Sequence, residues 1–326
     1  MKVYHDLNEY HAPIHRPVVT LGNFDGVHLG HRKIFELLKE EARECGATAM
    51  VITFYPHPLK IINPQKAPPL IASLDERLQL IKSCGIDFIA CIPFTETFAG
   101  WSPERFVQEI LVDELDVTRV LVGEDFRFGK GRKAGLNFLR KSGESHGFHV
   151  HRIEPVQIHD QEISSTRIRQ AILKGHVRKA ATMLDRPYNI TGTVVHGEHV
   201  GRTLGFPTAN IETQAELIPA NGVYAVNALC EGENLSGVAN LGVKPTFSGK
   251  KFTIEINIFN FDKDIYGKSL QVDFIERIRD ERPFPNVQTL IQQIQKDCDQ
   301  ARKILQDSPE GYSPVYEEKR RVLSRR

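Results

Sequence analysis

The chain has 326 residues, of which 40% are hydrophobic and 25% charged, the balance of an ordinary globular protein long enough for two domains. Its 42 Lys and Arg residues nearly balance its 41 Asp and Glu residues, so no net field attracts nucleic acid or an acidic membrane. Five cysteines are scattered without a C-x-x-C pair, and no apolar run reaches membrane-spanning length. We therefore expect a soluble cytoplasmic protein with reduced thiols and with neither a nucleic-acid nor a membrane partner.

The first half of the chain alternates strand and helix patterns. One helix is predicted to begin after Ser73, which with Glu76 forms a capping box, and to stop at Gly85; another begins at Ser102-Pro103. Such alternation predicts parallel βαβ units and a doubly wound sheet, whose ligands bind at the carboxyl ends of the strands. The four strand patterns are Val18–Leu21, Ala47–Phe54, Asp87–Ile92 and Arg119–Gly123.

The segment Gly22–His31, GNFDGVHLGH, lies between the first of these strands and an amphipathic helix. His28 and His31 are three residues apart in the first helical turn, so both imidazoles can face one ligand. Free N–H groups and the positive end of the helix dipole favour a phosphate there, and glycines permit close approach. Two simpler interpretations remain, an ordinary glycine turn with surface histidines and a metal pair, although metal-binding helices usually space histidines four apart around a Glu.

Three further segments of the first half end strands or open a helix. Each has an ordinary alternative, namely a rigid proline turn, core phenylalanines and a simple helix cap. Their occurrence together with H-x-G-H at successive strand ends favours a nucleotide site. The segments are Thr53–Pro58 (TFYPHP), Gly123–Gly129 (GEDFRFG) and Ile163–Arg167 (ISSTR).

The second half changes from helices at Arg167–Leu173 and Val177–Leu184 to many short strands, which predict a small antiparallel barrel. A final helix after Pro285 carries one apolar stripe, expected to pack on a core: Leu290, Ile294, Cys298, Ala301 and Leu305. The strand patterns are Gly192–His196, Val223–Cys230, Ser236–Leu241, Phe252–Phe261 and Val272–Ile278, with a turn at residues 231–234. Phe252, Ile254, Ile256 and Ile258 share one predicted face.

The segment Gly201–Asn210, GRTLGFPTAN, brings a hydroxyl and an amide to the start of a stiff strand. Thr208 and Asn210 offer oxygen ligands that suit Mg²⁺ held together with nucleotide phosphates. Glu255, on the polar face of its strand, is a candidate general base toward a substrate hydroxyl. The alternation alone favours the simpler interpretation that Glu255 only faces solvent.

Together these motifs resemble the bacterial bifunctional riboflavin kinase/FMN adenylyltransferase (FAD synthetase) family, in the family's order from about Val18 to the final helix. The resemblance implies a Rossmann-like nucleotidyltransferase domain with a parallel sheet over residues 1–184, a β-barrel kinase domain with a C-terminal helix over 185–310, and a basic tail over 311–326. It implies that ATP phosphorylates riboflavin to FMN in the second domain. A second ATP then adenylylates FMN to FAD in the first domain with release of pyrophosphate, and Mg²⁺ assists.

The resemblance also implies the site residues. His28, His31 and Glu255 are the expected catalytic residues. ATP phosphates in the adenylyltransferase would meet Gly22, Phe24, Gly26, His28, His31, Ser164, Ser165, Thr166 and Arg167. Flavin or nucleotide would meet His57, Asp125, Phe126 and Phe128. The kinase site would use Gly201, Arg202, Gly205, Pro207, Thr208 and Asn210, with Mg²⁺ on Thr208 and Asn210.

The chain departs from the family pattern at a few positions. Asn257 and Asn260 stand where members often have His and Asp, Lys244 stands where they have Arg, and some have Asn at Asp125. Two other functions stay open on the sequence. One is an adenylyltransferase whose barrel only binds flavin or regulates, and the other is an RNA-associated module, since class I aminoacyl-tRNA synthetases also carry an H-x-G-H-type motif. No K-M-S-K-S-like segment or basic footprint supports the second.

Overall fold

The computed structural model describes residues 2–4, 16–86, 88–155, 157–158, 161–197, 200–246 and 249–307. The chain forms two compact units, Met1–Ser164 and Ser165–Arg326. The basic tail expected at residues 311–326 lies outside the described residues. No helix within the described ranges is long and apolar enough to cross a membrane.

The first unit is built on a six-stranded sheet in which every neighbouring pair is parallel, in the order β1-β4-β3-β2-β5-β6. The four predicted strands and their parallel arrangement are confirmed. The strands at the two edges were not predicted, and β6 shows why: its side chains are mostly exposed, so it lacks an apolar run. The strands are β1 (Lys2–Tyr4), β2 (Val18–Leu21), β3 (Ala49–Tyr55), β4 (Phe88–Pro93), β5 (Arg119–Gly123) and β6 (His149–Ile153).

The helices of the first unit begin where the capping signals predict. Ser73 Oγ accepts the Glu76 N–H at 3.2 Å, and Ser102 Oγ accepts the Arg105 N–H at 3.1 Å. Gly85 ends the helix after Ser73 with a φ of 76°. The helices are α1 (Leu29–Cys45), α2 (Pro58–Ile62), η2 (Pro64–Lys66), α3 (Leu74–Ser83), α4 (Glu96–Ala99), α5 (Pro103–Phe106), the π-helical η3 (Val107–Glu114), η4 (Lys130–Arg132) and α6 (Leu136–His146). A small hairpin pairs β7 (Gln157–Ile158) with β8 (Gln161–Glu162).

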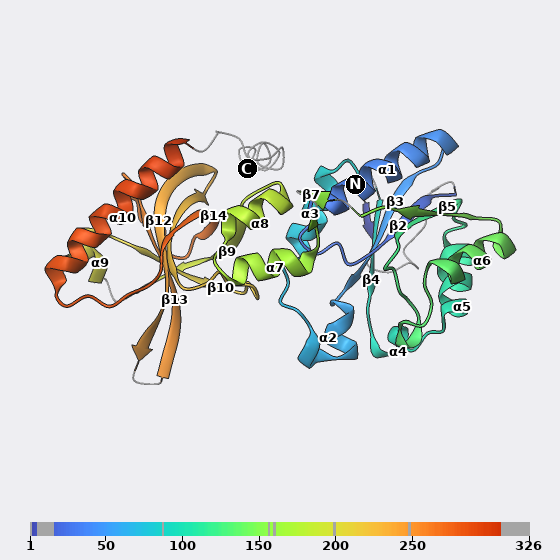
Figure 1. Cartoon of the computed structure of the whole chain (residues 1–326), viewed down its shortest axis with the longest axis horizontal. Coiled ribbons are helices and arrows are strands. Elements are labelled where there is room, and N and C mark those ends of the chain that lie inside the picture. Colours follow the sequence, from blue (N-terminus) through green and yellow to red (C-terminus); the bar gives the residue numbers. More distant parts are fainter. Residues whose placement is uncertain are drawn as a thin grey trace. The chain divides into compact units, whose positions relative to one another are not determined.

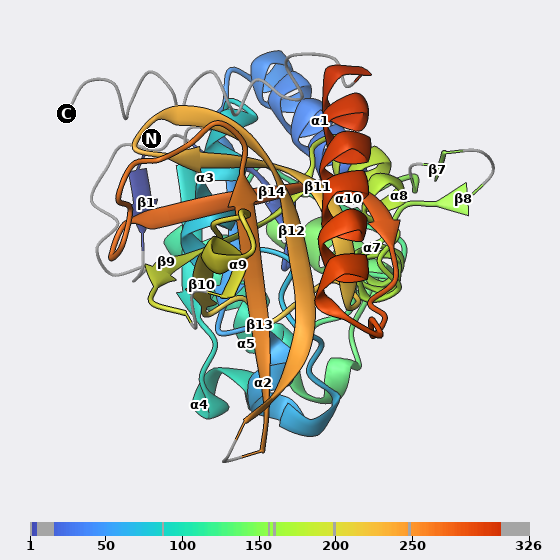
Figure 2. The same ribbon diagram turned by 90° about the vertical axis from the view of Figure 1, so that its left-hand side faces the viewer.

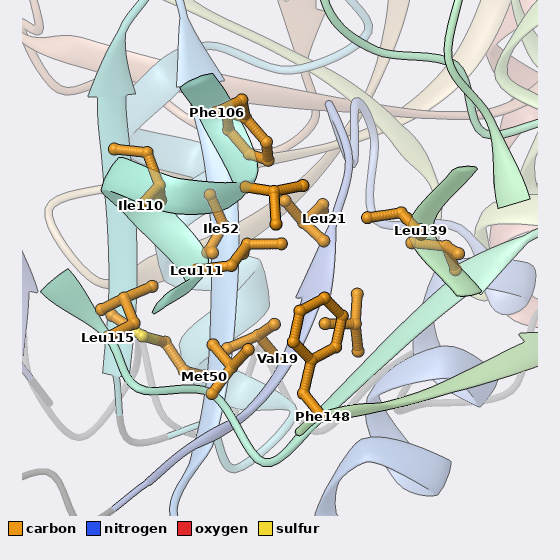
Figure 3. Packing of buried hydrophobic residues seen from close by; sticks show 14 of the residues in the cluster. Val19, Leu21, Met50, Ile52, Phe106, Ile110, Leu111, Leu115, Leu139 and Phe148 are labelled. Atoms are coloured by element: carbon orange, nitrogen blue, oxygen red, sulfur yellow. The ribbon is translucent and has the colours of Figure 1, made fainter. Parts of the chain in front are cut away.

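Both faces of this sheet are covered, which is why its inner strands are almost continuously apolar. On one face, Val19 and Leu21 of β2 and Met50 of β3 pack against α5, η3 and α6 (Figure 3). The intervening side chains, such as Val18, point to the opposite face, where α1 packs on β2 and β3. Ligand loops are therefore left only at the ends of the strands.

The order of the strands reverses at β2, which has β3 on one side and β5 on the other. In a doubly wound sheet this is the point where loops diverge and open a crevice at the carboxyl ends of the strands. The loops after β2, β3 and β5 carry three of the predicted motifs, Gly22–His31, Thr53–Pro58 and Gly123–Gly129. The fold thus places these motifs at one edge of the sheet (Figure 1).

The second unit begins with α7 (Ser165–Leu173) and α8 (Val177–Leu184) and continues into a closed antiparallel barrel in the order β10-β13-β12-β11-β14-β9, as predicted. Its elements are β9 (Tyr188–Val195), α9 (Val200–Thr203), β10 (Ala209–Thr213), β11 (Gly222–Cys230), β12 (Glu233–Thr246), β13 (Gly249–Ile258) and β14 (Ser269–Arg279). The turn between β11 and β12 is tighter than predicted: only Glu231 and Gly232 lie outside the ladder, both with positive φ, as a twisted two-residue hairpin requires.

The last helix, α10 (Val287–Asp307), packs on the outside of the barrel against β11, β12 and β14 (Figure 2). Cys298 and Ala301 are fully buried there against Val223, Ala225 and Val238. The predicted role of its apolar stripe as core packing is confirmed. Along β13, Ile254, Ile256 and Ile258 of the predicted face are buried, whereas Phe252, nearer the start of the strand, is 38% exposed.

Candidate active sites

The loop after β2 has an unusual backbone. Phe24, Gly26 and Val27 all have positive φ values, of 47°, 79° and 39°. A Cβ on Gly26 would lie 2.8 Å from Ile71, so both conformation and space require glycine. The buried Asp25 carboxylate accepts the N–H groups of Ile71 and Ala72 at 3.0 to 3.3 Å. The loop is therefore fixed by contacts to the segment that enters α3.

The two histidines form a stacked pair at the start of α1. Their ring centroids are 3.6 Å apart with the planes inclined by 19°. His28 is the N-cap of α1 rather than part of its first turn, and its Nδ1 accepts the His31 N–H at 3.3 Å. In a neutral His28 the ring proton is then on Nε2. Gly30 makes this arrangement possible, because its Cβ position lies 3.1 Å from the His28 ring.

His31 is set up to be a neutral imidazole. Burial, followed by the charges of His28 and Arg77, holds the pKa of His31 well below its usual range. Its Nδ1 is buried, and among the described residues it has no hydrogen-bond partner. The Phe24 ring packs edge-on against the His31 ring, with the two ring centroids 5.2 Å apart. A buried polar atom without a partner is costly and points to a ligand contact.

The loop after β3 approaches the same place through His57. Its Nδ1 accepts the Leu59 N–H at 3.2 Å and so caps α2, while its Nε2 lies 3.2 Å from the Asn23 amide nitrogen. Because the capping bond leaves the proton on Nε2, the Asn23 amide should present its oxygen to this ring. The contact with Asn23 connects this loop to the loop after β2. The expected contact of His57 with nucleotide or flavin stays a prediction.

The loop after β5 carries two stacked phenylalanines. The Phe126 and Phe128 rings are 5.5 Å apart and inclined by 23°, and both are half-buried against the core of the first unit. Phe128 also contacts Phe106 and Phe138. Asp125 is exposed. Partial burial fits both interpretations of the rings, core packing and a flavin platform.

The fourth motif of the first half spans the division between the two units. Ser164 ends the first unit, and Ser165, Thr166 and Arg167 open α7. Within the first unit the Ile163 carbonyl lies 3.8 Å from the Cβ position of Gly30, so this segment reaches the H-x-G-H turn. The phosphate contacts expected of residues 164–167 stay predictions.

In the second unit, the candidate metal ligand and the candidate base face each other. Asn210 of β10 and Glu255 of β13 are directly paired in the antiparallel register, and Asn240 of β12 pairs with Glu255 from the other side. Paired residues project from the same face of a sheet with Cβ atoms about 5 Å apart. Two glycines make room here: a Cβ on Gly197 would overlap the Asn210 amide, and one on Gly201 would lie 3.2 Å from Thr208 Oγ1.

The loop from Gly201 to Pro207 is held by its backbone and by α10. The Phe206 N–H donates to the Gly201 carbonyl at 2.8 Å, and Gly205 has a φ of 87°. The Phe206 ring packs on the cluster beneath α10. Asn257 donates its amide N–H to the Pro207 carbonyl at 2.7 Å. The departure from histidine at position 257 therefore keeps a side-chain donor beside the strand that carries Thr208.

Close to this face lies a pocket of about 340 Å³ at the start of α10. Glu281, just before the pocket, contacts Gly242 so closely that a Cβ there would overlap its carboxylate. Gly242 is two residues along β12 from Asn240, which pairs with Glu255. The guanidinium of Arg282 lies 5.2 Å from the centre of the Phe284 ring. The pocket is lined by Arg282, Pro283, Phe284, Pro285, Thr289, Gln292, Gln293 and Lys296.

Comparison with known proteins decides between the functions left open by the sequence. A family model described as FAD synthetase matches residues 11–167, and one described as riboflavin kinase matches residues 184–305. A bifunctional riboflavin kinase/FMN adenylyltransferase of Escherichia coli K12 is 39% identical over 90% of this chain and 93% of its own length. The chain belongs to the bifunctional riboflavin kinase/FMN adenylyltransferase family. Its first unit is an FMN adenylyltransferase module, and its barrel is a riboflavin kinase module.

Two further relatives agree in extent. The Bacillus subtilis member of the family is 38% identical over 88% of this chain and 92% of its own length. The crystal structure of a macrolide-efflux protein from Streptococcus pneumoniae superposes with a TM-score of 0.82 and 30% identity, covering 94% of this chain and 99% of the other. The similarity to that structure thus extends over nearly the whole two-unit fold. Kinase and nucleotidyltransferase activities are both family properties of this chain.

Sequence reasoning missed three features of these sites. Arg77 is buried beneath the adenylyltransferase loops, Gly197 lies against Asn210, and the pocket opens at the start of α10. A signal for Arg77 exists, since it occupies the apolar stripe of α3, three residues after Leu74 and four before Ile81. A cation at a core position of an amphipathic helix requires polar partners, so this position could have been predicted to contact polar groups.

Proposed function

We propose that FMN adenylylation takes place at the loops after β2, β3 and β5, with His28 and His31 on the phosphates of ATP. The observation that supports this most is the stacked pair at the start of α1, with the Nδ1 of His31 buried and, among the described residues, unpartnered. A helix N-terminus with free N–H groups favours the same ligand. Ser164, Ser165, Thr166 and Arg167 are assigned to the phosphates on their sequence pattern.

In this reaction an oxygen of the FMN phosphate forms a bond to the α-phosphorus of ATP. The bond from that phosphorus to the bridging oxygen breaks, and pyrophosphate leaves with the electron pair. Negative charge grows on the phosphates, and N–H groups fixed beforehand stabilise it without reorganisation. We assign His28 and His31 to this charge: the Nδ1 of His28 accepts the His31 N–H, and the low pKa of His31 keeps its ring neutral near pH 7.

The flavin ring of FMN is assigned to the side of the loop after β5. Phe126 and Phe128 offer stacked, half-buried faces, and flat rings favour offset stacking on such faces. Asp125 and His57 complete the assignment as polar contacts to flavin or nucleotide. The same two phenylalanines also contribute to the core, so replacing Phe126, which makes fewer ring contacts, is the cleaner test.

For the kinase reaction, Glu255 takes the proton from the 5′-hydroxyl of riboflavin as that oxygen attacks the γ-phosphorus of ATP, and ADP leaves. Thr208 and Asn210 fit Mg²⁺, because both offer neutral oxygens and Asn210 is paired with Glu255. Gly197 and Gly201 have no side chain and so allow the backbone to lie close to these two residues. Bound there, the ion would supply charge stabilisation to the phosphates. Gly201, Arg202, Gly205 and Pro207 shape the loop that precedes these ligands.

The ring of riboflavin is assigned to the pocket at the start of α10. Its volume falls in the range of small-molecule sites, and its wall combines Phe284 with the amide groups of Gln292 and Gln293. The contact of Glu281 with Gly242 connects this pocket to the face that carries Glu255. The domain boundary after residue 184 and a cytoplasmic location complete the proposal, and the five free thiols support the latter.

Two variants test the two-site assignment, with flavins separated by chromatography after incubation with riboflavin, ATP and Mg²⁺. His31→Ala should let FMN accumulate while FAD formation falls by about 10²–10³-fold, the loss expected for one charge-stabilising donor. Glu255→Gln should stop FMN formation and leave the conversion of added FMN to FAD intact. If either folded variant lost both activities equally, the assignment of separate sites would be wrong.

A further inference from the structure

A buried arginine lies beneath the adenylyltransferase loops, and neither the family motifs nor the proposed mechanism uses it. Arg77 of α3 is only 2% exposed. Its Nη1 donates to the Asn23 carbonyl at 2.9 Å and its Nη2 donates to the Phe54 carbonyl at 3.0 Å. Asn23 follows β2 and Phe54 belongs to β3, so one guanidinium joins the ends of two neighbouring strands.

The same segment holds the loop at a second point. Asp25, two residues after Asn23, accepts the N–H groups of Ile71 and Ala72, which lead directly into α3. The loop that carries His28 and His31 is thus fastened on both sides of Phe24. The Thr53 hydroxyl donates a second hydrogen bond to the Asn23 carbonyl, at 3.3 Å.

Burying a guanidinium against two neutral carbonyls is an expensive way to stabilise a fold. Removing a cation from water costs several kcal/mol, and carbonyl dipoles offset this less well than a bound carboxylate does. Burial accordingly lowers the pKa of Arg77, although the charges of Cys91, Asp25 and Tyr55 act in the other direction. Its Nε is buried and, within the described part of the chain, without a hydrogen-bond partner. An apolar side chain would fill this space at lower cost.

We propose that Arg77 is a positioning residue for FMN adenylylation: by holding the Asn23 and Phe54 carbonyls it fixes where the His28/His31 pair meets the phosphates of ATP. The inference rests on the assignment of those histidines to ATP. Its physical basis is that phosphoryl chemistry depends on placement, and a misplacement of about 1 Å can cost about 10²-fold in rate. The charge of Arg77 also contributes to the low pKa of His31.

The test compares two variants in the full chain. Arg77→Met keeps the length of the side chain without its charge or donors, and Arg77→Lys keeps the charge but has a single ammonium in place of a two-pronged donor. For both we expect the kcat of FMN adenylylation to fall by about 10- to 100-fold with a KM for ATP changed less than about threefold. Riboflavin phosphorylation, measured on the same molecules, should keep its kcat and KM.

A matched variant separates positioning from stability. Leu80 is a buried residue of the same helix whose aliphatic side chain cannot donate a hydrogen bond to the two carbonyls, so Leu80→Ala should lower the melting temperature yet retain the kcat of adenylylation. Three outcomes would each overturn the proposal. The Arg77→Met variant could keep the wild-type kcat of adenylylation, the Arg77→Lys variant could keep it, or Leu80→Ala could lose as much kcat as the Arg77 variants.

If Arg77→Met does not fold, Arg77→Lys and Arg77→Gln decide by the same kinetic criterion. Failure of the underlying assignment looks different. In that case His31→Ala would itself keep wild-type FAD formation, whatever the Arg77 variants do.

Discussion

Asn210 and Glu255 lie directly opposite each other across the antiparallel strands β10 and β13. The two residues are 45 positions apart in the chain, so only the closed barrel brings the amide and the carboxylate to one point on one face. The pairing gives the predicted metal ligand and the predicted base a common position, which alternation along β13 alone did not do. Glu255 itself is half-buried on this face.

From this pairing we expect Asn210→Ala to weaken the use of Mg²⁺ by the kinase. Loss of one oxygen ligand should raise the Mg²⁺ concentration for half-maximal riboflavin phosphorylation by about 10- to 100-fold. Titrating Mg²⁺ at a fixed, saturating concentration of ATP measures this half-maximal concentration. Asn240→Ala is the matched control, because Asn240 flanks Glu255 from β12 with the same amide chemistry but lies outside the assigned ligands. An equal shift in both variants would contradict the role given to Asn210.

A second expectation concerns Gly197, whose Cβ position overlaps the Asn210 amide. Gly197→Ala should push this side chain away and lower the kcat/KM of riboflavin phosphorylation by about 10-fold, with FMN adenylylation unchanged. Because the clash needs the Asn210 side chain, adding Gly197→Ala to Asn210→Ala should cost little more. A double-mutant cycle on kcat/KM measures this coupling. Strictly additive losses would mean that Gly197 acts through something other than Asn210.

Whether a feature could be predicted from the sequence depends on how far apart in the chain its interacting residues lie. The strands β2 to β5 are buried on both faces, so their apolar runs were readable, and caps such as Ser73 and Ser102 act over three residues. The polar edge strand β6 carries no such run. The motif loops were predicted because strand order alone collects them at the β2 switch point.

The parts of the sites that were not predicted depend on contacts between distant segments. Arg77 reaches Asn23 across 54 positions, and no local pattern states which carbonyl a buried arginine will find. The role of His28 as an N-cap was also missed, because helix boundaries shift by a residue or two with the geometry of the preceding loop. Gly197 owes its importance to a side chain on the neighbouring strand.

The low pKa of His31 makes folding depend on pH. In the unfolded chain a histidine titrates near pH 6.5, whereas folded His31 stays neutral to lower pH. Between these values the unfolded state binds more protons, so this group lowers the free energy of unfolding as pH falls below about 6.5 and has no such effect above it. His31→Asn should therefore flatten the decline of the melting temperature from about pH 6.5 to 5.

Differential scanning calorimetry at closely spaced pH values measures that slope. Absolute stabilities of wild type and variant will differ for reasons of packing, and only the change with pH is diagnostic. His149→Asn is the control for loss of one histidine, because this ring is exposed on β6. A His31→Asn curve as steep as the wild type would contradict a buried, neutral His31.

The last expectation concerns the attachment of α10 to the kinase barrel. Asp297 is 3% exposed, and its carboxylate accepts two N–H groups of Arg279 at 2.7 to 3.0 Å and the Gln293 amide at 2.8 Å. Removing the carboxylate leaves a largely buried guanidinium without its partner, which costs about 3 kcal/mol. Asp297→Ala should thus lower the melting transition of the barrel by several degrees, whereas Asp299→Ala, two residues away with an exposed side chain, should leave it nearly unchanged.

The loss of Asp297 should also affect the binding of riboflavin. Because Arg279 and Arg282 both lie over the Phe284 ring, the Asp297→Ala change should loosen the pocket wall and raise the KM for riboflavin more than that for ATP. Calorimetry with paired kinetics of FMN formation measures both effects, and equal changes in the two KM values would argue against placing the flavin ring in this pocket.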